Sequence, residues 1–84
     1  MLQIVFAGPP AGALLLVDTL GVAGFPARVD DQRGGFPPED GIEWVEAVAG
    51  SADYLAEVTA IAERFGFVLR LHSWIEAPAQ AVLL

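Results

Sequence analysis

The sequence predicts an α+β sandwich of the split βαβ kind, and three observations carry that prediction. A strand, helix, strand pattern over residues 2–31 recurs over residues 42–75. Each predicted helix is followed by a glycine, Gly24 or Gly66, which is the usual residue just beyond a helix end. A glycine- and proline-rich segment, residues 32–41, joins the halves. Two such halves build a four-stranded antiparallel sheet with both helices on one face.

The first half begins with an apolar strand at residues 2–7, which Gly8 and two prolines end. A helix from about Pro10 to Ala23 follows, because proline is favoured in the first turn of a helix. The residues at helical spacing that we expect to face the sheet are Ala13, Leu16, Val17 and Leu20. Leu14, Leu15 and Val22 fall outside that stripe, so we expect the helix to be covered on more than one side.

The remaining elements follow the same logic. Residues 25–31 form the second strand, and Pro26 predicts that it lies at a sheet edge. The third strand is residues 42–48. The second helix starts after the N-cap Ser51 and runs to Phe65 with a clean apolar stripe. Residues 67–75 form the fourth strand, and 77–84 are an apolar tail that the pattern does not place. The expected architecture is one ferredoxin-like βαββαβ domain, residues 1–84, with sheet order 4-1-3-2.

Strand alternation predicts which side chains lie on the sheet face that carries no helix, called the open face here. Phe67, Leu69 and Leu71 are expected under the helices. The residues expected on the open face are Arg28, Trp44, Glu46, Arg70, His72 and Trp74. Two tryptophans, two arginines and a histidine are typical of an interaction surface, so we predict that these residues bind a ligand or partner.

Each of these residues also has a structural interpretation. Arg70 and Glu46 are equally well explained as a pair across the sheet, and the tryptophans as contacts to a second subunit. His72 is a structural histidine or, in an enzyme, a general base, which needs a positioned partner such as Glu46. The first turn, with Gly8 and Gly12, either presents N–H groups to an anion or only reverses the chain.

Composition limits the partners. The chain has a net charge of −7, with four arginines and no lysine, so we expect no nucleic acid and no anionic membrane as partner. With no cysteine and one histidine, we expect no metal site and no cofactor.

Without a long apolar segment or a signal sequence, the expected location is cytoplasmic. A hydrophobic fraction of 55% in 84 residues predicts a homo-oligomer. The acidic residues of the long loop, which would attract a basic protein partner, are Asp31, Glu39 and Asp40.

The spacing of residues in the first half resembles the ACT domain, a small ligand-binding regulatory module. The positions that keep the spacing of that family are Gly12, Leu14, Val17, Leu20 and Gly24. Ala11 stands where proline is common in the family, and no asparagine follows Gly24. The resemblance covers about 25 residues and implies amino-acid binding near the first turn at a dimer interface. The chain is also similar to dimeric α+β barrels, in which Arg70, His72 and Trp74 would line a pocket.

The sequence therefore favours a small non-enzymatic ligand-binding or regulatory module that acts as a homo-oligomer. Two alternatives stay open. One is an acidic protein-interaction module of the inhibitor or immunity type, which would cap a basic partner through the loop. The other is a small enzyme of the dimeric α+β barrel type, which needs a closed cavity around His72.

Overall fold

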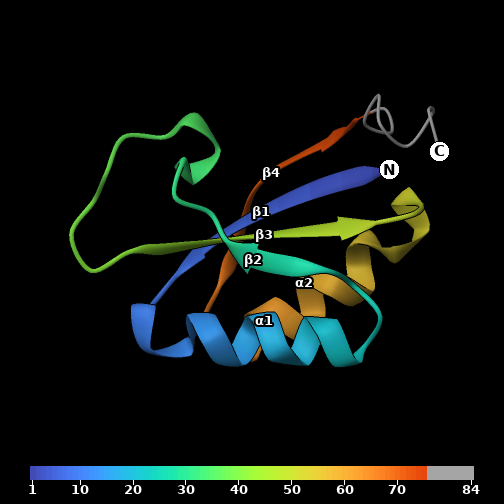
Figure 1. Cartoon of the computed structure of the whole chain (residues 1–84), viewed down its shortest axis with the longest axis horizontal. Helices are drawn as coiled ribbons and strands as arrows, with labels where there is room; N and C mark the ends of the chain where they lie inside the picture. Colours follow the sequence, from blue (N-terminus) through green and yellow to red (C-terminus); the bar gives the residue numbers. More distant parts are fainter. Residues whose placement is uncertain (76–84) are drawn as a thin grey trace, which may run out of the picture.

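The computed structural model describes residues 1–75, and it shows a four-stranded sheet with two helices on one face (Figure 1). All neighbouring strands are antiparallel, and their order is β2-β3-β1-β4. This confirms the predicted ferredoxin-like fold and the order 4-1-3-2. The elements are β1 (Leu2–Gly8), α1 (Ala13–Val22), β2 (Ala27–Val29), β3 (Glu43–Ala49), α2 (Leu55–Glu63) and β4 (Val68–Trp74). The predicted tail, 77–84, lies outside the described residues.

Short 3-10 turns precede both helices, and both helices end in the same way. Residues Pro10–Gly12 lead into α1 and Ala52–Tyr54 lead into α2. The Ser51 hydroxyl accepts a hydrogen bond from the Asp53 N–H, as expected of an N-cap. Beyond α1, Gly24 has φ +97°, and the Phe25 N–H donates to the Leu20 carbonyl. Beyond α2, Gly66 has φ +79°, and the Phe67 N–H donates to the Ala62 carbonyl. Both ends are Schellman motifs, which is why glycine is needed there.

The main core lies between the sheet and the helices. The stripe predicted for α1 is confirmed, because Ala13, Leu16 and Leu20 are buried and Val17 packs against them. From the sheet, β1 contributes every second residue. The α2 residues in or against this core are Leu55, Val58, Ile61 and Ala62. The rest of α1 is not covered by the described residues, because Leu14, Leu15 and Val22 are 71%, 59% and 91% exposed.

Two predicted strands differ from the observed ones. The second strand was expected over residues 25–31, yet β2 has only three residues. It starts late because the Phe25 N–H is used by the end of α1. It ends early because the chain turns at Asp30, whose side chain accepts a hydrogen bond from the Gln32 N–H. The fourth strand has the expected bounds within one residue, but its alternation is interrupted.

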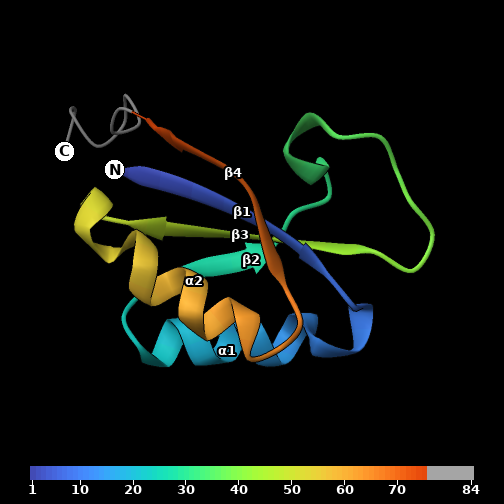
Figure 2. The same cartoon turned by 180° about the vertical axis from the view of Figure 1, so that it is seen from behind.

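A β-bulge at Arg70 interrupts that alternation. Phe6 pairs with Leu69, and Val5 pairs with Leu71, so Arg70 has no residue opposite it. Residues that pair across an antiparallel ladder lie on the same face of the sheet. Leu71 therefore shares the open face with Val5, and the prediction that it lies under the helices is wrong. Figure 2 shows β4 leaving the turn after α2 and curving along the edge of the sheet beside β1.

Gly8 allows β1 to pass very close to the turn between α2 and β4. A Cβ atom at this position would lie 2.6 Å from Phe67 Cγ and 2.9 Å from the Gly66 carbonyl oxygen. Phe67 is fully buried, so its ring has no free space to move into.

We expect Gly8→Ala to lower the free energy of unfolding by about 1–3 kcal/mol, measured by urea denaturation. The matched control is Gly21→Ala, because nothing lies within 4 Å of that position in α1. It should raise stability by about 0.5–1 kcal/mol. Equal stability of Gly8→Ala and the wild type would contradict the close approach.

Candidate functional site

The loop of residues 32–41 folds back over the open face and buries Trp44. The Phe36 ring stacks on the Trp44 ring with 5.2 Å between centroids and 13° between planes. The Arg70 guanidinium carbon lies 4.8 Å from the Phe36 centroid and 5.4 Å from the Trp44 centroid. These rings join Val5 and Ala7 in a second, smaller core. The open face is therefore partly covered by the chain itself.

Side-chain to main-chain hydrogen bonds fix the conformation of this loop. Arg33 adopts a positive φ of 56°, which is uncommon for a residue with a side chain. Its Nε donates to the Phe36 carbonyl at 3.1 Å, and its Nη1 donates to the Asp31 carbonyl at 3.1 Å. The Phe36 N–H donates in turn to the Arg33 carbonyl. These bonds place Phe36 over Trp44.

Asp30 anchors the start of the loop. It is only 4% exposed, and its Oδ1 accepts a hydrogen bond of 2.9 Å from the Gln32 N–H. Its own N–H donates to the Trp44 carbonyl at 2.8 Å, and its carbonyl accepts from the Arg33 N–H. Because a buried carboxylate is tolerated only with such partners, Asp30 fixes where the chain leaves the sheet.

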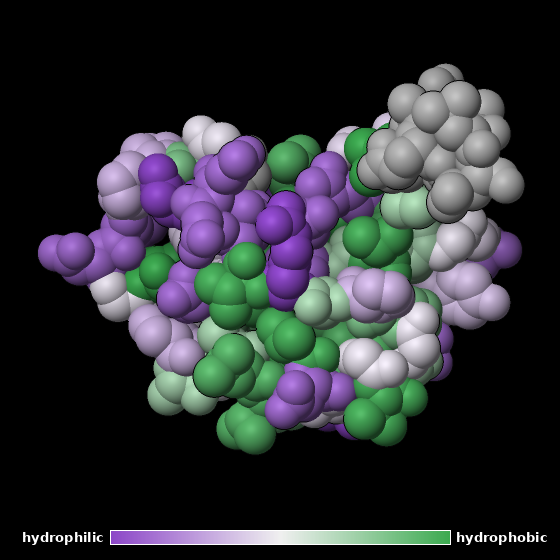
Figure 3. Space-filling model, in the orientation of Figure 1, coloured by the Kyte–Doolittle hydropathy of each residue, from purple (hydrophilic) through white to green (hydrophobic). Residues whose placement is uncertain are grey.

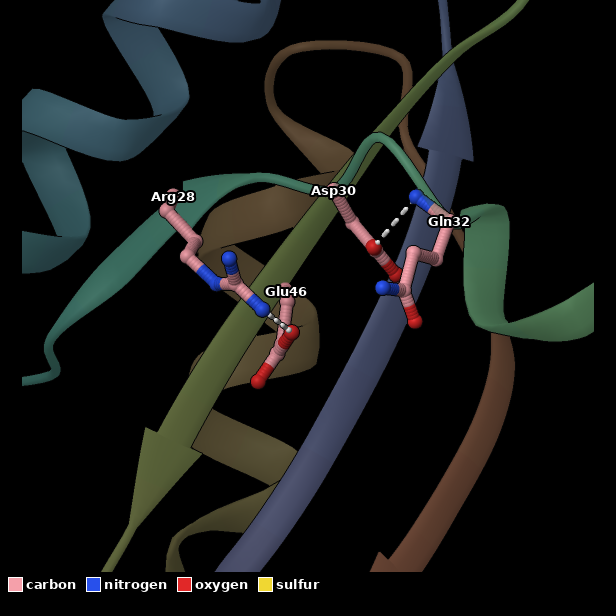
Figure 4. A network of polar contacts seen from close by, with 4 residues as sticks. All are labelled: Arg28, Asp30, Gln32 and Glu46. Atoms are coloured by element: carbon pink, nitrogen blue, oxygen red, sulfur yellow. Dashed lines mark hydrogen bonds and ion pairs between the residues drawn. The ribbon is translucent and has the colours of Figure 1, made fainter.

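A polar cleft of about 240 Å³ lies between this loop and the sheet. Its lining residues are Gln3, Val5, Arg28, Asp30, Gln32, Gly35, Glu46 and Leu71. Arg28 Nη2 and Glu46 Oε2 are 3.0 Å apart, and Figure 4 shows these side chains pointing toward each other from β2 and β3, beside Asp30 and Gln32. The cleft thus presents one guanidinium, two carboxylates, amide groups and two apolar side chains.

The ion pair in the cleft is asymmetric. The Arg28 side chain is 71% exposed, whereas that of Glu46 is 12% exposed. Because the guanidinium lies largely in solvent, it can exchange Glu46 for another partner only when a second cation takes its place beside the nearly buried carboxylate.

A larger hollow has a poorer set of chemical groups. It measures about 380 Å³ and lies where α1 ends, between the Phe25–Pro26 segment and Tyr54. Among residues 1–75 its lining is mostly apolar side chains and backbone, with Glu57 as the one charged side chain. The smaller cleft brings charged side chains of both signs together and is the better candidate site for a charged ligand.

The bulge separates the six residues that the sequence predicts on the open face. Arg28 and Glu46 line the cleft, and Arg70 stacks on the loop. Trp44 lies on this face too, but it is 2% exposed because Phe36 covers it, so it is not a free contact surface for a second subunit.

His72 and Trp74 are not on the open face, and this part of the prediction is wrong. His72 pairs with Ile4 and Trp74 pairs with Leu2, and both β1 residues belong to the core on the helix side. The extra residue at Arg70 reverses the alternation beyond it. His72 therefore does not meet Glu46, and the two do not form an acid–base pair.

The glycines of the first turn have a packing role. Gly8 lies against Phe67, and a Cβ on Gly12 would be 3.2 Å from the Phe65 carbonyl oxygen. Side chains and backbone of the α2–β4 connection thus fill the space beside this turn. That these glycines also contact a ligand stays a prediction. The acidic residues of the loop, Asp31, Glu39 and Asp40, are exposed.

Within residues 1–75, no group of three or more His, Cys, Asp or Glu side chains is placed to hold a metal ion. No helix in the same range has the length and apolar character needed to cross a membrane. The sequence matches no protein-family model, no curated protein and no solved structure. The arguments about function therefore depend on the geometry of the chain.

Sequence reasoning missed the cleft and loop residues Phe36 and Gln32, and it placed Asp30 on the open face without its role in the turn. Phe36 is the only aromatic residue within a glycine- and proline-rich loop, which is a signal that the loop packs against something. Asp30 and Gln32 have the spacing of a side-chain turn, in which an aspartate accepts from the N–H two residues on. Both signals are local and were present in the sequence.

Proposed function

We propose that this domain is a small non-enzymatic ligand-binding module that works as a homo-oligomer, with the cleft beside Arg28 and Glu46 as its ligand site. The observation that carries the proposal is the juxtaposition of an exposed guanidinium and a nearly buried carboxylate over an apolar floor. A regulatory role, as in ACT domains, agrees with the fold and with the spacing of residues in the first half.

The size and charges of the cleft favour a zwitterion as small as an amino acid. Sites for drug-sized molecules usually measure about 300–1,000 Å³, and this cleft is smaller, at about 240 Å³. A ligand ammonium would take the place of Arg28 against Glu46, and a ligand carboxylate would bind the released guanidinium. Val5 and Leu71 would contact a short apolar side chain.

Binding is tested by NMR titration of the full chain with a panel of free amino acids. We expect at least one to shift the amide signals of Arg28, Asp30 and Leu71, and its N-acetylated or amidated derivative to bind at least tenfold more weakly. Glu46→Gln should weaken binding about tenfold or more, because truncating one partner of a charge pair has effects of this size. Glu63→Gln, on the exposed side of α2, is the matched control. Binding by no amino acid, or binding that ignores Glu46→Gln, would refute the site.

The outer edge of β4 supports the homo-oligomer. This strand has seven residues, is mostly exposed and contains no proline, lysine or acid. Val68 and Trp74 are 55% and 61% exposed. An edge strand without proline, lysine or acid can pair with another strand through its outward N–H and C=O groups on either side of the bulge at Arg70. Because β4 contains no acid, a two-fold pairing of β4 with its copy sets no carboxylate of this strand against another, despite the net charge of −7.

Light scattering at micromolar concentration should give at least twice the chain mass of 8.9 kDa. The double variant Val68→Lys/Trp74→Lys should give the monomer mass, because lysines on an edge strand oppose pairing. Val22→Lys, a similar change on α1, should leave the mass unchanged. A wild-type monomer would overturn this part of the proposal and leave the cleft proposal intact.

A further inference from the structure

The outer side of α1 carries an apolar surface that the fold does not use. Leu14, Leu15 and Val22, called the α1 ridge here, point away from the buried stripe and are 71%, 59% and 91% exposed. In Figure 3 the side of the molecule formed by α1 is largely apolar. A helix that is apolar on both sides normally has a partner on each side.

The helix layer around this ridge is acidic. Asp18 is exposed on α1 itself, and α1 carries no basic residue. The exposed acids elsewhere in the helix layer, on α2 and the turn before it, are Asp53, Glu57 and Glu63. Only Arg64 opposes them, because Arg28, Arg33 and Arg70 belong to the sheet and the loop. The layer thus combines an apolar ridge with a net negative flank.

This charge pattern decides between two occupants. A second copy of the chain would pair α1 with α1 about a two-fold axis, which brings the two Asp18 side chains toward each other in a complex of two chains that each carry a net charge of −7. A partner with basic residues gains attraction at the same positions instead. Gly21 has no side chain, and no atom lies within 4 Å of the place that its Cβ would occupy, so the surface has open space beside the ridge. A partner backbone can approach closely there.

We infer that the α1 ridge binds an amphipathic helix of a partner protein, with an apolar stripe against Leu14, Leu15 and Val22 and basic residues toward Asp18. Recognition of this kind uses apolar anchors at helical spacing, and charge sets the partner and its orientation. The surface is separate from the cleft, which lies on the opposite face of the sheet.

The test uses a synthetic helical peptide of about 18 residues with leucine on one face and lysine on both flanks. It is titrated into the full chain, with binding followed by calorimetry and by NMR shifts of the α1 amides. The double variant Leu15→Glu/Val22→Glu should weaken binding at least tenfold, because it removes the apolar contacts. Charge alone would predict the opposite, since the two added glutamates attract the basic peptide. Both side chains are mostly exposed, so the core stays intact. Asp18→Asn should weaken binding a few-fold and reduce its salt dependence.

The controls separate docking from general attraction to an acidic protein. Val68→Glu adds a charge on β4 and should not weaken binding. A peptide with glutamate in place of lysine, and a lysine peptide without the apolar face, should bind at least tenfold more weakly. Unchanged or tighter binding by Leu15→Glu/Val22→Glu would overturn the inference, as would shifts confined to β4 or the cleft. A wild-type dimer that this double variant converts to a monomer would assign the ridge to a second copy and also overturn it.

Discussion

The burial of Trp44 beneath Phe36 and Arg70 is the interaction on which the site depends. The ring stack contributes about 0.5–1.5 kcal/mol beyond its buried area, and the guanidinium contributes a further amount of similar size. There is a cost, because no group within residues 1–75 accepts a hydrogen bond from the buried Trp44 Nε1. This stack holds the loop against the sheet, and the loop forms one wall of the cleft. Without it, Arg28 and Glu46 would be an ordinary surface ion pair.

The bulge at Arg70 determines which residues join this arrangement. It keeps Arg70 over the two rings and brings Leu71 to the cleft floor, and it turns His72 and Trp74 to the other face. One inserted residue thus divides β4 into a part that belongs to the site and a part that does not. The whole of β4 lies at the sheet edge, where we propose that a second subunit pairs.

The elements and their order followed from the sequence because apolar periodicity and helix-ending glycines are local signals. Gly24 and Gly66 mark both helix ends, and the α1 stripe lies against the sheet as predicted. The faces of β2 and β3 followed as well. The sequence could not predict the sheet face of His72 and Trp74, because the bulge arises from the pairing of β4 with β1. The sequence of β4 itself contains no signal for a bulge. The cover over Trp44 was missed because it is a long-range contact, although Phe36 in the loop was a hint.

The central claim is that the loop holds Trp44 closed in the free protein. Hydrogen exchange of the two indole N–H groups, followed by NMR, tests it most directly. We expect the Trp44 signal to exchange at least ten times more slowly than that of Trp74, whose side chain is 61% exposed, and to lose this protection in Phe36→Ala. Equally fast exchange of both indoles in the wild-type chain would contradict the cover, and with it the cleft that the loop encloses.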